Sequence, residues 1–195
     1  MSNAFWPSRR AAALLAVAAS VGLAACGGSS SVTGALLSGT ISGLTADGLV
    51  LTSGGSNLAV AANSTAFTFT GRLTLGGTYA VSVKTQPTGL VCRVANATGT
   101  AVGDITNIAV TCAPAHSVGG SVTGLVASGL VLANGSDNVS VPANSTSFVF
   151  PAKVGEGSSY GVTVLTQPAG QTCTVANGAS FVGQSDVTSV QVSCI

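Results

Sequence analysis

The sequence predicts an all-β protein built from two β-sandwich domains in tandem. The first observation is composition: the chain has 195 residues, with 26 glycines, 46% hydrophobic residues and only 6% charged residues. A chain rich in Val, Thr, Ser, Gly and Ala with so few charges is typical of short strands joined by tight turns. The second observation is period-two alternation of apolar and polar residues, and the third is an internal repeat.

The repeat defines the domain organisation. Residues 39–92 align with residues 120–173 without a gap, and 26 of the 54 paired positions are identical. The segment Thr-Gln-Pro-x-Gly-x-x-Cys occurs in both copies, and both copies end in a cysteine, at Cys112 and Cys194. A sequence that repeats itself at a fixed interval indicates a duplicated structural unit.

We therefore expect one β-sandwich at residues 37–113 and a second at residues 116–195. The segment between them, Ala113 to Ala115, is short and contains a proline, so we expect a linker that allows restricted motion between the domains. The single histidine, His116, follows this segment and is expected to be a solvated linker residue.

Each copy can be read as about seven short strands. Alternation is clearest at residues 78–85, where Tyr79, Val81 and Val83 share one face of the predicted strand. Such faces would enclose one small core between two sheets, as in a β-sandwich. In the first copy the expected strands lie near residues 39–44, 49–52, 57–61, 66–70, 78–85, 91–95 and 105–112.

Four cysteines occupy matching places in the two copies. In each copy one opens the sixth expected strand and the other closes the seventh, so Cys92 can meet Cys112, and Cys173 can meet Cys194. Four cysteines allow three pairings, and the duplication favours the two within copies. Closing a loop of about 20 residues stabilises a domain by ~3 kcal/mol.

A metal site is the alternative use of these cysteines. No Cys-x-x-Cys occurs, and the only histidine lies between the copies, so the spacing argues against metal binding and against thiol redox catalysis. We expect structural disulfides, no bound metal and no cofactor.

The titratable residues do not favour catalysis. The chain has one histidine and five carboxylates, which are spread along it, and only Asp104 and Asp186 occupy matching positions. An aspartate just before a strand is more often a turn cap than an acid or base, so we expect no catalytic residues and no enzyme. With a net charge of +1 and no basic stripe, the chain is not expected to bind nucleic acid.

A ligand-binding residue is harder to identify. Most aromatic residues recur at matching repeat positions, which indicates core, but Phe181 has no aromatic counterpart. As a loop aromatic it can be either a contact residue or a buried plug. Exposed strand edges offer a second route to a partner, by strand addition.

The N-terminal segment resembles the signal of a bacterial lipoprotein. Arg9 and Arg10 precede an apolar run at residues 11–23, and the run ends in Leu23-Ala24-Ala25-Cys26, which looks like a lipobox. The resemblance implies a signal peptide at residues 1–25, lipidation of Cys26 with palmitate or related acyl chains, and a flexible tether at 26–36. The alternatives are a transmembrane anchor, for which the run falls short of the required ~20 residues, and an ordinary signal peptide with a chance cysteine.

The repeats carry a second resemblance. The pattern Gly-Leu-Val-Leu, Phe-x-Phe, Tyr-x-Val-x-Val and Thr-Gln-Pro-x-Gly-x-x-Cys is similar to an immunoglobulin-like repeat of proteobacterial cell-envelope lipoproteins, over residues 39–194. Together the resemblances imply a lipid-anchored envelope protein, and the absence of aspartate at Gly27 points to the outer membrane. We expect a structural or adhesive display module with a protein or glycan partner. A periplasm-facing binding or assembly component is the alternative, and both surface and periplasmic orientations stay open.

Overall fold

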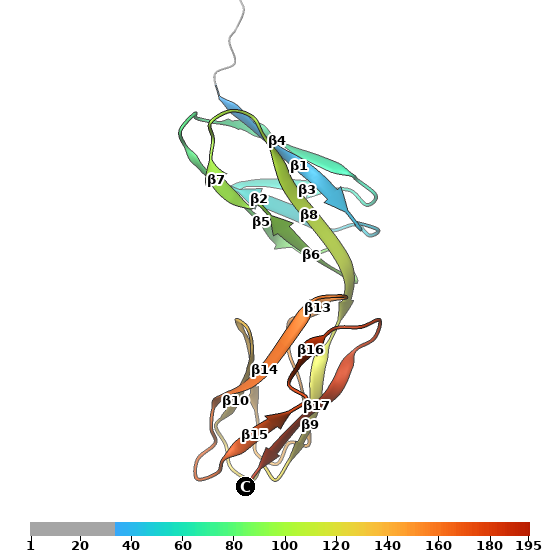
Figure 1. The fold of residues 1–195 in the computed structure, drawn as a ribbon, viewed down its shortest axis with the longest axis vertical. Coiled ribbons are helices and arrows are strands. Elements are labelled where there is room, and N and C mark those ends of the chain that lie inside the picture. The colour runs from blue at the N-terminus through green and yellow to red at the C-terminus, as the bar shows by residue number, and fades with distance from the viewer. Residues whose placement is uncertain (1–33) are drawn as a thin grey trace, which may run out of the picture. The chain divides into compact units, whose positions relative to one another are not determined.

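The computed structural model describes residues 34–195, and all the regular secondary structure in this range is β-strand (Figure 1). The all-β prediction is therefore confirmed. The predicted signal peptide at 1–25 and the lipidation site Cys26 lie outside the described residues, as does most of the expected tether at 26–36. Within residues 34–195 no helix has the length and apolarity that a membrane crossing requires.

The first repeat contributes four strands to each of two sheets. One sheet has β8 in its interior, with β1 and then β4 on one side and β6 on the other, and the second sheet has the order β3-β2-β5-β7. Seven of these strands overlap the expected ranges, and the three-residue β7 was not predicted. The bounds are β1 (Ala35–Ser42), β2 (Leu49–Ser53), β3 (Ser56–Val60), β4 (Ala66–Leu73), β5 (Thr78–Thr85), β6 (Leu90–Ala95), β7 (Thr98–Thr100) and β8 (Ile105–His116).

The second repeat has the same plan, with sheets ordered β12-β9-β17-β15 and β11-β10-β14-β16. The counterpart of β4 is split into β12 and β13, because Pro151 stands where the first repeat has Thr70 and proline has no N–H to donate. The bounds are β9 (Val118–Thr123), β10 (Leu130–Asn134), β11 (Asp137–Val141), β12 (Ser147–Val149), β13 (Val154–Gly155), β14 (Ser159–Thr166), β15 (Cys173–Ala176), β16 (Ala179–Phe181) and β17 (Val187–Cys194).

Strand β8 belongs to both repeats. The segment Ala113 to Ala115, expected to be a linker, lies inside β8 and is held on both sides of the junction. Strand β6 pairs with β8 as far as Pro114, and β13 pairs with its last two residues, Ala115 and His116. The backbone N–H of Glu156 also donates to the carbonyl of Pro114 at 2.8 Å. The last strand of the first repeat therefore continues directly into the second repeat.

Each repeat encloses its own hydrophobic core, made by the inward faces of both sheets. The Phe-x-Phe pairs contribute to both cores: the rings of Phe67 and Phe69 are edge to face at 6.0 Å, and those of Phe148 and Phe150 at 5.7 Å. These aromatics are buried, as their repetition predicted.

The first and last long strands of each repeat pair in parallel, β1 with β8 and β9 with β17. At the centre of each pair a glycine is required by close backbone approach. A Cβ added at Gly39 would lie 2.2 Å from the carbonyl oxygen of Ile108, and one at Gly120 would lie 1.8 Å from that of Val190. The duplicated glycine therefore allows the terminal strands to pair.

Candidate functional site

The structure contains two disulfides, Cys92–Cys112 and Cys173–Cys194, with the predicted pairing within each repeat. Each joins two residues that lie directly opposite one another on antiparallel strands, β6 with β8 and β15 with β17. All four cysteines are buried. They are therefore part of the two cores. Within residues 34–195, no group of three or more His, Cys, Asp or Glu side chains is placed to hold a metal ion.

A glutamine holds one cysteine of each pair. The Nε2 of Gln86 donates to the carbonyl of Cys92 at 3.0 Å, and the backbone N–H of Cys92 donates to Oε1 of Gln86 at 2.7 Å. Gln167 makes the same two bonds with Cys173, at the same distances. Sequence reasoning missed this role, although the repeated Thr-Gln-Pro segment was its signal.

The two aspartates at matching positions bond to the backbone. Asp104 Oδ1 accepts a hydrogen bond from the N–H of Leu36 at 2.7 Å, and Asp186 Oδ1 accepts one from the N–H of Ser117 at 2.8 Å. The pKa of Asp186 lies below its ordinary value. The largest cause is the hydrogen bond from the Ser117 backbone, and the next is the hydrogen bond from the Ser117 side chain. The charges of Lys153 and His116 lower the pKa further. Both aspartates therefore tie the first strand of a repeat to the start of its last strand.

The expectation that His116 is a solvated linker residue is wrong. Its side chain is 14% exposed, because β13 pairs with the end of β8 and places Val154 opposite His116. Nδ1 lies 3.7 Å from Asp186 Oδ1, while Nε2 is buried and has no hydrogen-bond partner among the described residues. His116 is therefore a structural residue of the junction strand.

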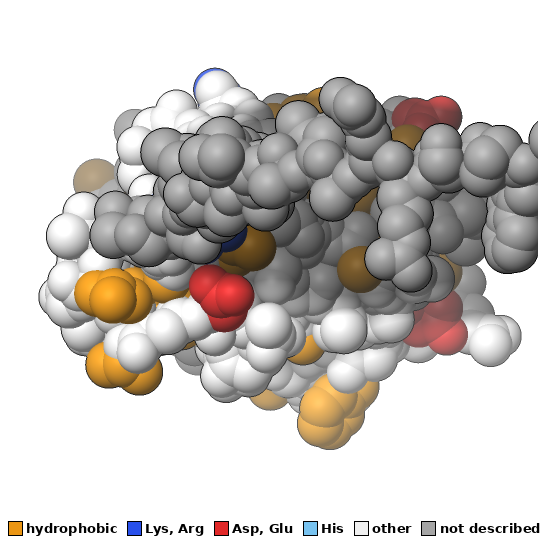
Figure 2. All heavy atoms as spheres, turned by 90° about the horizontal axis from the view of Figure 1, so that it is seen from above, with side chains coloured by type: hydrophobic (Ala, Val, Ile, Leu, Met, Phe, Trp, Pro, Cys, Tyr) orange, Lys and Arg blue, Asp and Glu red, His pale blue; other side chains and the backbone are white. Residues whose placement is uncertain are grey.

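Phe181 is a surface residue. It lies at the end of β16, opposite Ser159 of β14, and is 73% exposed. The buried-plug alternative is therefore excluded. Other large apolar side chains are also exposed, such as Val102 in the first repeat and Leu165 in the second. The described side chains visible in Figure 2 show apolar and charged groups scattered over the face, with no gathering of Lys and Arg.

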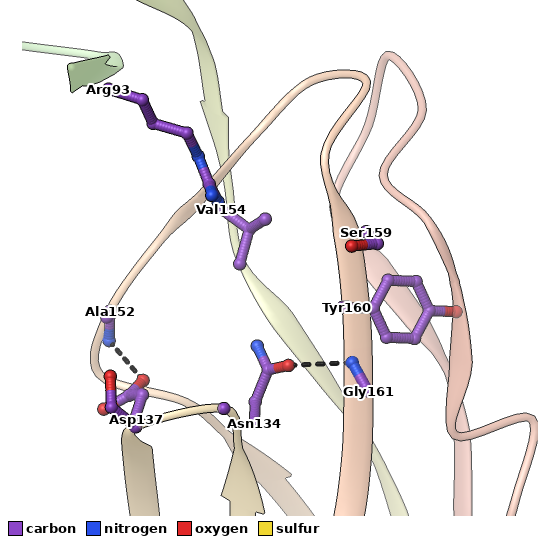
Figure 3. A pocket seen from close by; sticks show the side chains of 10 residues that line it. Arg93, Asn134, Asp137, Ala152, Val154, Ser159, Tyr160 and Gly161 are labelled. Atoms are coloured by element: carbon purple, nitrogen blue, oxygen red, sulfur yellow. Dashed lines mark hydrogen bonds between the residues drawn. The ribbon is translucent and has the colours of Figure 1, made fainter. Parts of the chain in front are cut away.

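A cavity of about 580 Å³ opens in the second repeat (Figure 3). Two of its polar side chains are held by backbone N–H groups. Asn134 Oδ1 accepts from Gly161 at 2.9 Å, and Asp137 Oδ2 accepts from Ala152 at 3.0 Å. These bonds leave the Asn134 Nδ2 and the second oxygen of Asp137 available to a ligand.

The other walls of this cavity come from β13, β14 and β6. Tyr160 of β14 is 7% exposed and packs in the core, and Ser159 precedes it. Arg93 of β6 is exposed and reaches towards Val154 in Figure 3. In the part of the chain that the structure describes, its guanidinium forms no ion pair with an acidic side chain.

The first repeat has a smaller cavity at the same place, of about 170 Å³. It is lined at the equivalent positions by Ser53, Gly54, Ser56, Gly71 and Leu73, each 81 residues before its counterpart. Arg72 donates to the carbonyl of Gly34 at 2.7 Å beside this cavity. The site is therefore a feature of the repeat that has become larger and more polar in the second copy.

No protein-family model matches the chain, and no curated protein sequence matches it. Among solved structures, one similarity is to the major pilin protein T-13 from Streptococcus pyogenes serotype GAS131465. It covers 84% of this chain and 97% of the pilin, with 13% sequence identity and a TM-score of 0.22. A TM-score this low supports no inference about the function of this chain.

Proposed function

We propose that the chain is a non-enzymatic, membrane-anchored lipoprotein of the bacterial envelope that acts as a structural or adhesive display module. The observation that carries this proposal is strand β8, which is the last strand of one sandwich and continues into the next. A module that displays a surface away from a membrane benefits from such a connection, because the chain is hydrogen-bonded throughout the junction. The two disulfides suit an oxidising compartment outside the cytoplasm.

The non-enzymatic part of the proposal is supported by what the carboxylates do. Four of the five accept hydrogen bonds from backbone N–H groups, at 2.7 to 3.0 Å: Asp47, Asp104, Asp137 and Asp186. Each of these bonds fixes a turn or the start of a strand. These bonds favour a structural role for the four carboxylates over general acid–base chemistry.

The anchor is proposed from the sequence. Lipidation of Cys26 would attach the protein to the outer membrane, and residues 27–34 would form the tether before β1 begins at Ala35. Because β1 begins before residue 37, the tether in this proposal is slightly shorter than the sequence suggested. The membrane is then the first partner of the chain, and a protein or glycan is the second.

Metabolic labelling with palmitate tests the anchor. Cells expressing the full chain should incorporate label into it, and Cys26→Ala should abolish the incorporation. Cys92→Ala with Cys112→Ala is the matched control, because it removes two cysteines and should leave the labelling intact. Equal labelling of the wild type and the Cys26→Ala variant would contradict the proposal.

Protease treatment of the same cells separates display from the alternative. Cleavage on intact cells would support a display module that faces outward. Protection until the outer membrane is permeabilised would support a periplasm-facing binding or assembly component. The cavity of the second repeat is compatible with both candidates, because it would offer a binding site in either compartment.

A further inference from the structure

We propose that the cavity of the second repeat binds a short neutral saccharide. The inference rests on the adhesive form of the proposed function and names the ligand class for it. The site is formed by the β10–β11 hairpin, by β14 and by Arg93 of β6 (Figure 3). At about 580 Å³ its volume lies within the range of about 300–1,000 Å³ that is usual for small-molecule sites.

The free polar groups of the cavity match a ligand that is rich in hydroxyls. A hydroxyl both donates and accepts hydrogen bonds, so it is best held by neighbouring donors and acceptors. Among residues 34–195, no hydrogen bond is made by Asn134 Nδ2, a donor, or by the second oxygen of Asp137, an acceptor, and the guanidinium of Arg93 supplies further donors. Because backbone N–H groups hold Asn134 and Asp137 in place, little side-chain entropy is lost when a ligand binds.

The charges of the cavity favour a neutral ligand. Among the residues that line it, Arg93 carries the single positive charge and Asp137 the single negative charge. A carboxylate or phosphate on the ligand would be attracted by Arg93 and repelled by Asp137. Hydroxyl groups can hydrogen-bond to both side chains, and hydrogen bonds to ionised groups are stronger than those between neutral groups.

The comparison of the two repeats indicates that the site is specialised. Of the nine lining positions in the second repeat, only Gly135 and Tyr160 are identical to their counterparts in the first, against 26 of 54 over the whole aligned segment. Asn134 stands in place of Ser53, and Asp137 in place of Ser56. The substitutions therefore place a carboxamide and a carboxylate at two positions where the first repeat folds with serine.

Nuclear magnetic resonance of the full chain tests the inference. The ¹⁵N-labelled protein, in a detergent without a sugar headgroup, is titrated to millimolar concentrations with maltotriose, cellotriose and triacetylchitotriose. At least one of these should give saturable shifts at the backbone signals of Gly135 and Gly161 and at the side-chain amide of Asn134. Absence of saturable shifts at these groups with all three sugars would overturn the proposal.

Substitutions inside and outside the cavity test which residues hold the sugar. The double variant Asn134→Ser and Asp137→Ser should bind at least tenfold more weakly and keep a dispersed, folded spectrum, and Arg93→Gln should also weaken binding. Lys153→Arg introduces the residue of the first repeat outside the cavity and should bind like the wild type. Unchanged affinity in the double variant would overturn the proposal.

Two further outcomes separate the claims. Tighter binding of trigalacturonic acid than of every neutral trisaccharide would overturn the neutral ligand class. A chain that incorporates palmitate through Cys26 and binds none of the sugars would overturn this inference and leave the anchored module standing. Sugar binding without palmitate incorporation would do the reverse.

Discussion

Replacing Gln86 by alanine should destabilise the first repeat selectively. The substitution removes two hydrogen bonds to the backbone of Cys92, at 3.0 and 2.7 Å, and leaves both backbone groups without a protein partner. Each such bond contributes a net ~0.5–1.5 kcal/mol, so the free energy of unfolding should fall by about 2 kcal/mol. For a domain of this size about 2 kcal/mol corresponds to a shift in Tm of roughly 8–16 °C.

Urea and thermal denaturation of the Gln86→Ala variant measure this effect, followed by circular dichroism and by native-state hydrogen exchange for each repeat. Thr88→Ala is the matched control, because it lies in the same loop and introduces the residue that the second repeat has at that position. The control should stay within about 0.5 kcal/mol of the wild type. If the two variants unfold at the same urea concentration, the assignment of Gln86 as a backbone support is refuted.

Three further predictions concern the disulfides, the glycine of a parallel strand pair and the carboxylate of Asp186. Replacing both cysteines of either disulfide by alanine should lower the free energy of unfolding of that repeat by ~3 kcal/mol. The loss should be about equal in the two repeats, because the sequence separations of the cysteines are 20 and 21. Urea denaturation that shows no loss of stability would contradict this. Gly120→Ala should prevent folding of the second repeat, because its Cβ would meet the Val190 carbonyl, whereas Gly183→Ala has open space and should fold, as judged by hydrogen exchange. The pKa of Asp186 is lowered mainly by the N–H of Ser117, so its stabilising effect is present above the unfolded pKa of about 3.9 and is lost as the pH falls through the folded value. In the Asp186→Asn variant, stability should therefore fall less steeply than in the wild type as the pH drops below about 4. If the Tm of the variant and that of the wild type fall equally over this range, Asp186 does not have this role.

The fold was predictable from sequence because the same pattern occurs twice. Alternation at Tyr79, Val81 and Val83 predicted strand β5, and the matching cysteines favoured the disulfide pairing within each repeat that the structure shows. Strand β7 was missed because Thr98–Thr100 has three residues and no apolar alternation. A strand this short is defined by its partner β5 rather than by its own residues.

The candidate site was not predictable, for a different physical reason. Asn134 ends β10 and Asp137 begins β11, on either side of a tight turn, where both residue types are common without any binding role. Only the fold brings Ser159 and Arg93 to the same opening. His116 was misread for a similar reason, since its burial depends on the pairing of β13, a two-residue strand from elsewhere in the chain.

The parallel pairing of the terminal strands determines how each repeat would carry tension. In a parallel pair, the beginning of one strand and the end of the other lie at opposite ends of the ladder. A pull on the two ends of a repeat therefore loads the hydrogen bonds between β1 and β8, or between β9 and β17, together in shear rather than one after another. The disulfide at β8 or β17 then limits how far an opened repeat can extend, because the residues between its cysteines cannot be stretched out. Each repeat would therefore resist a force that is applied along the backbone at its two ends.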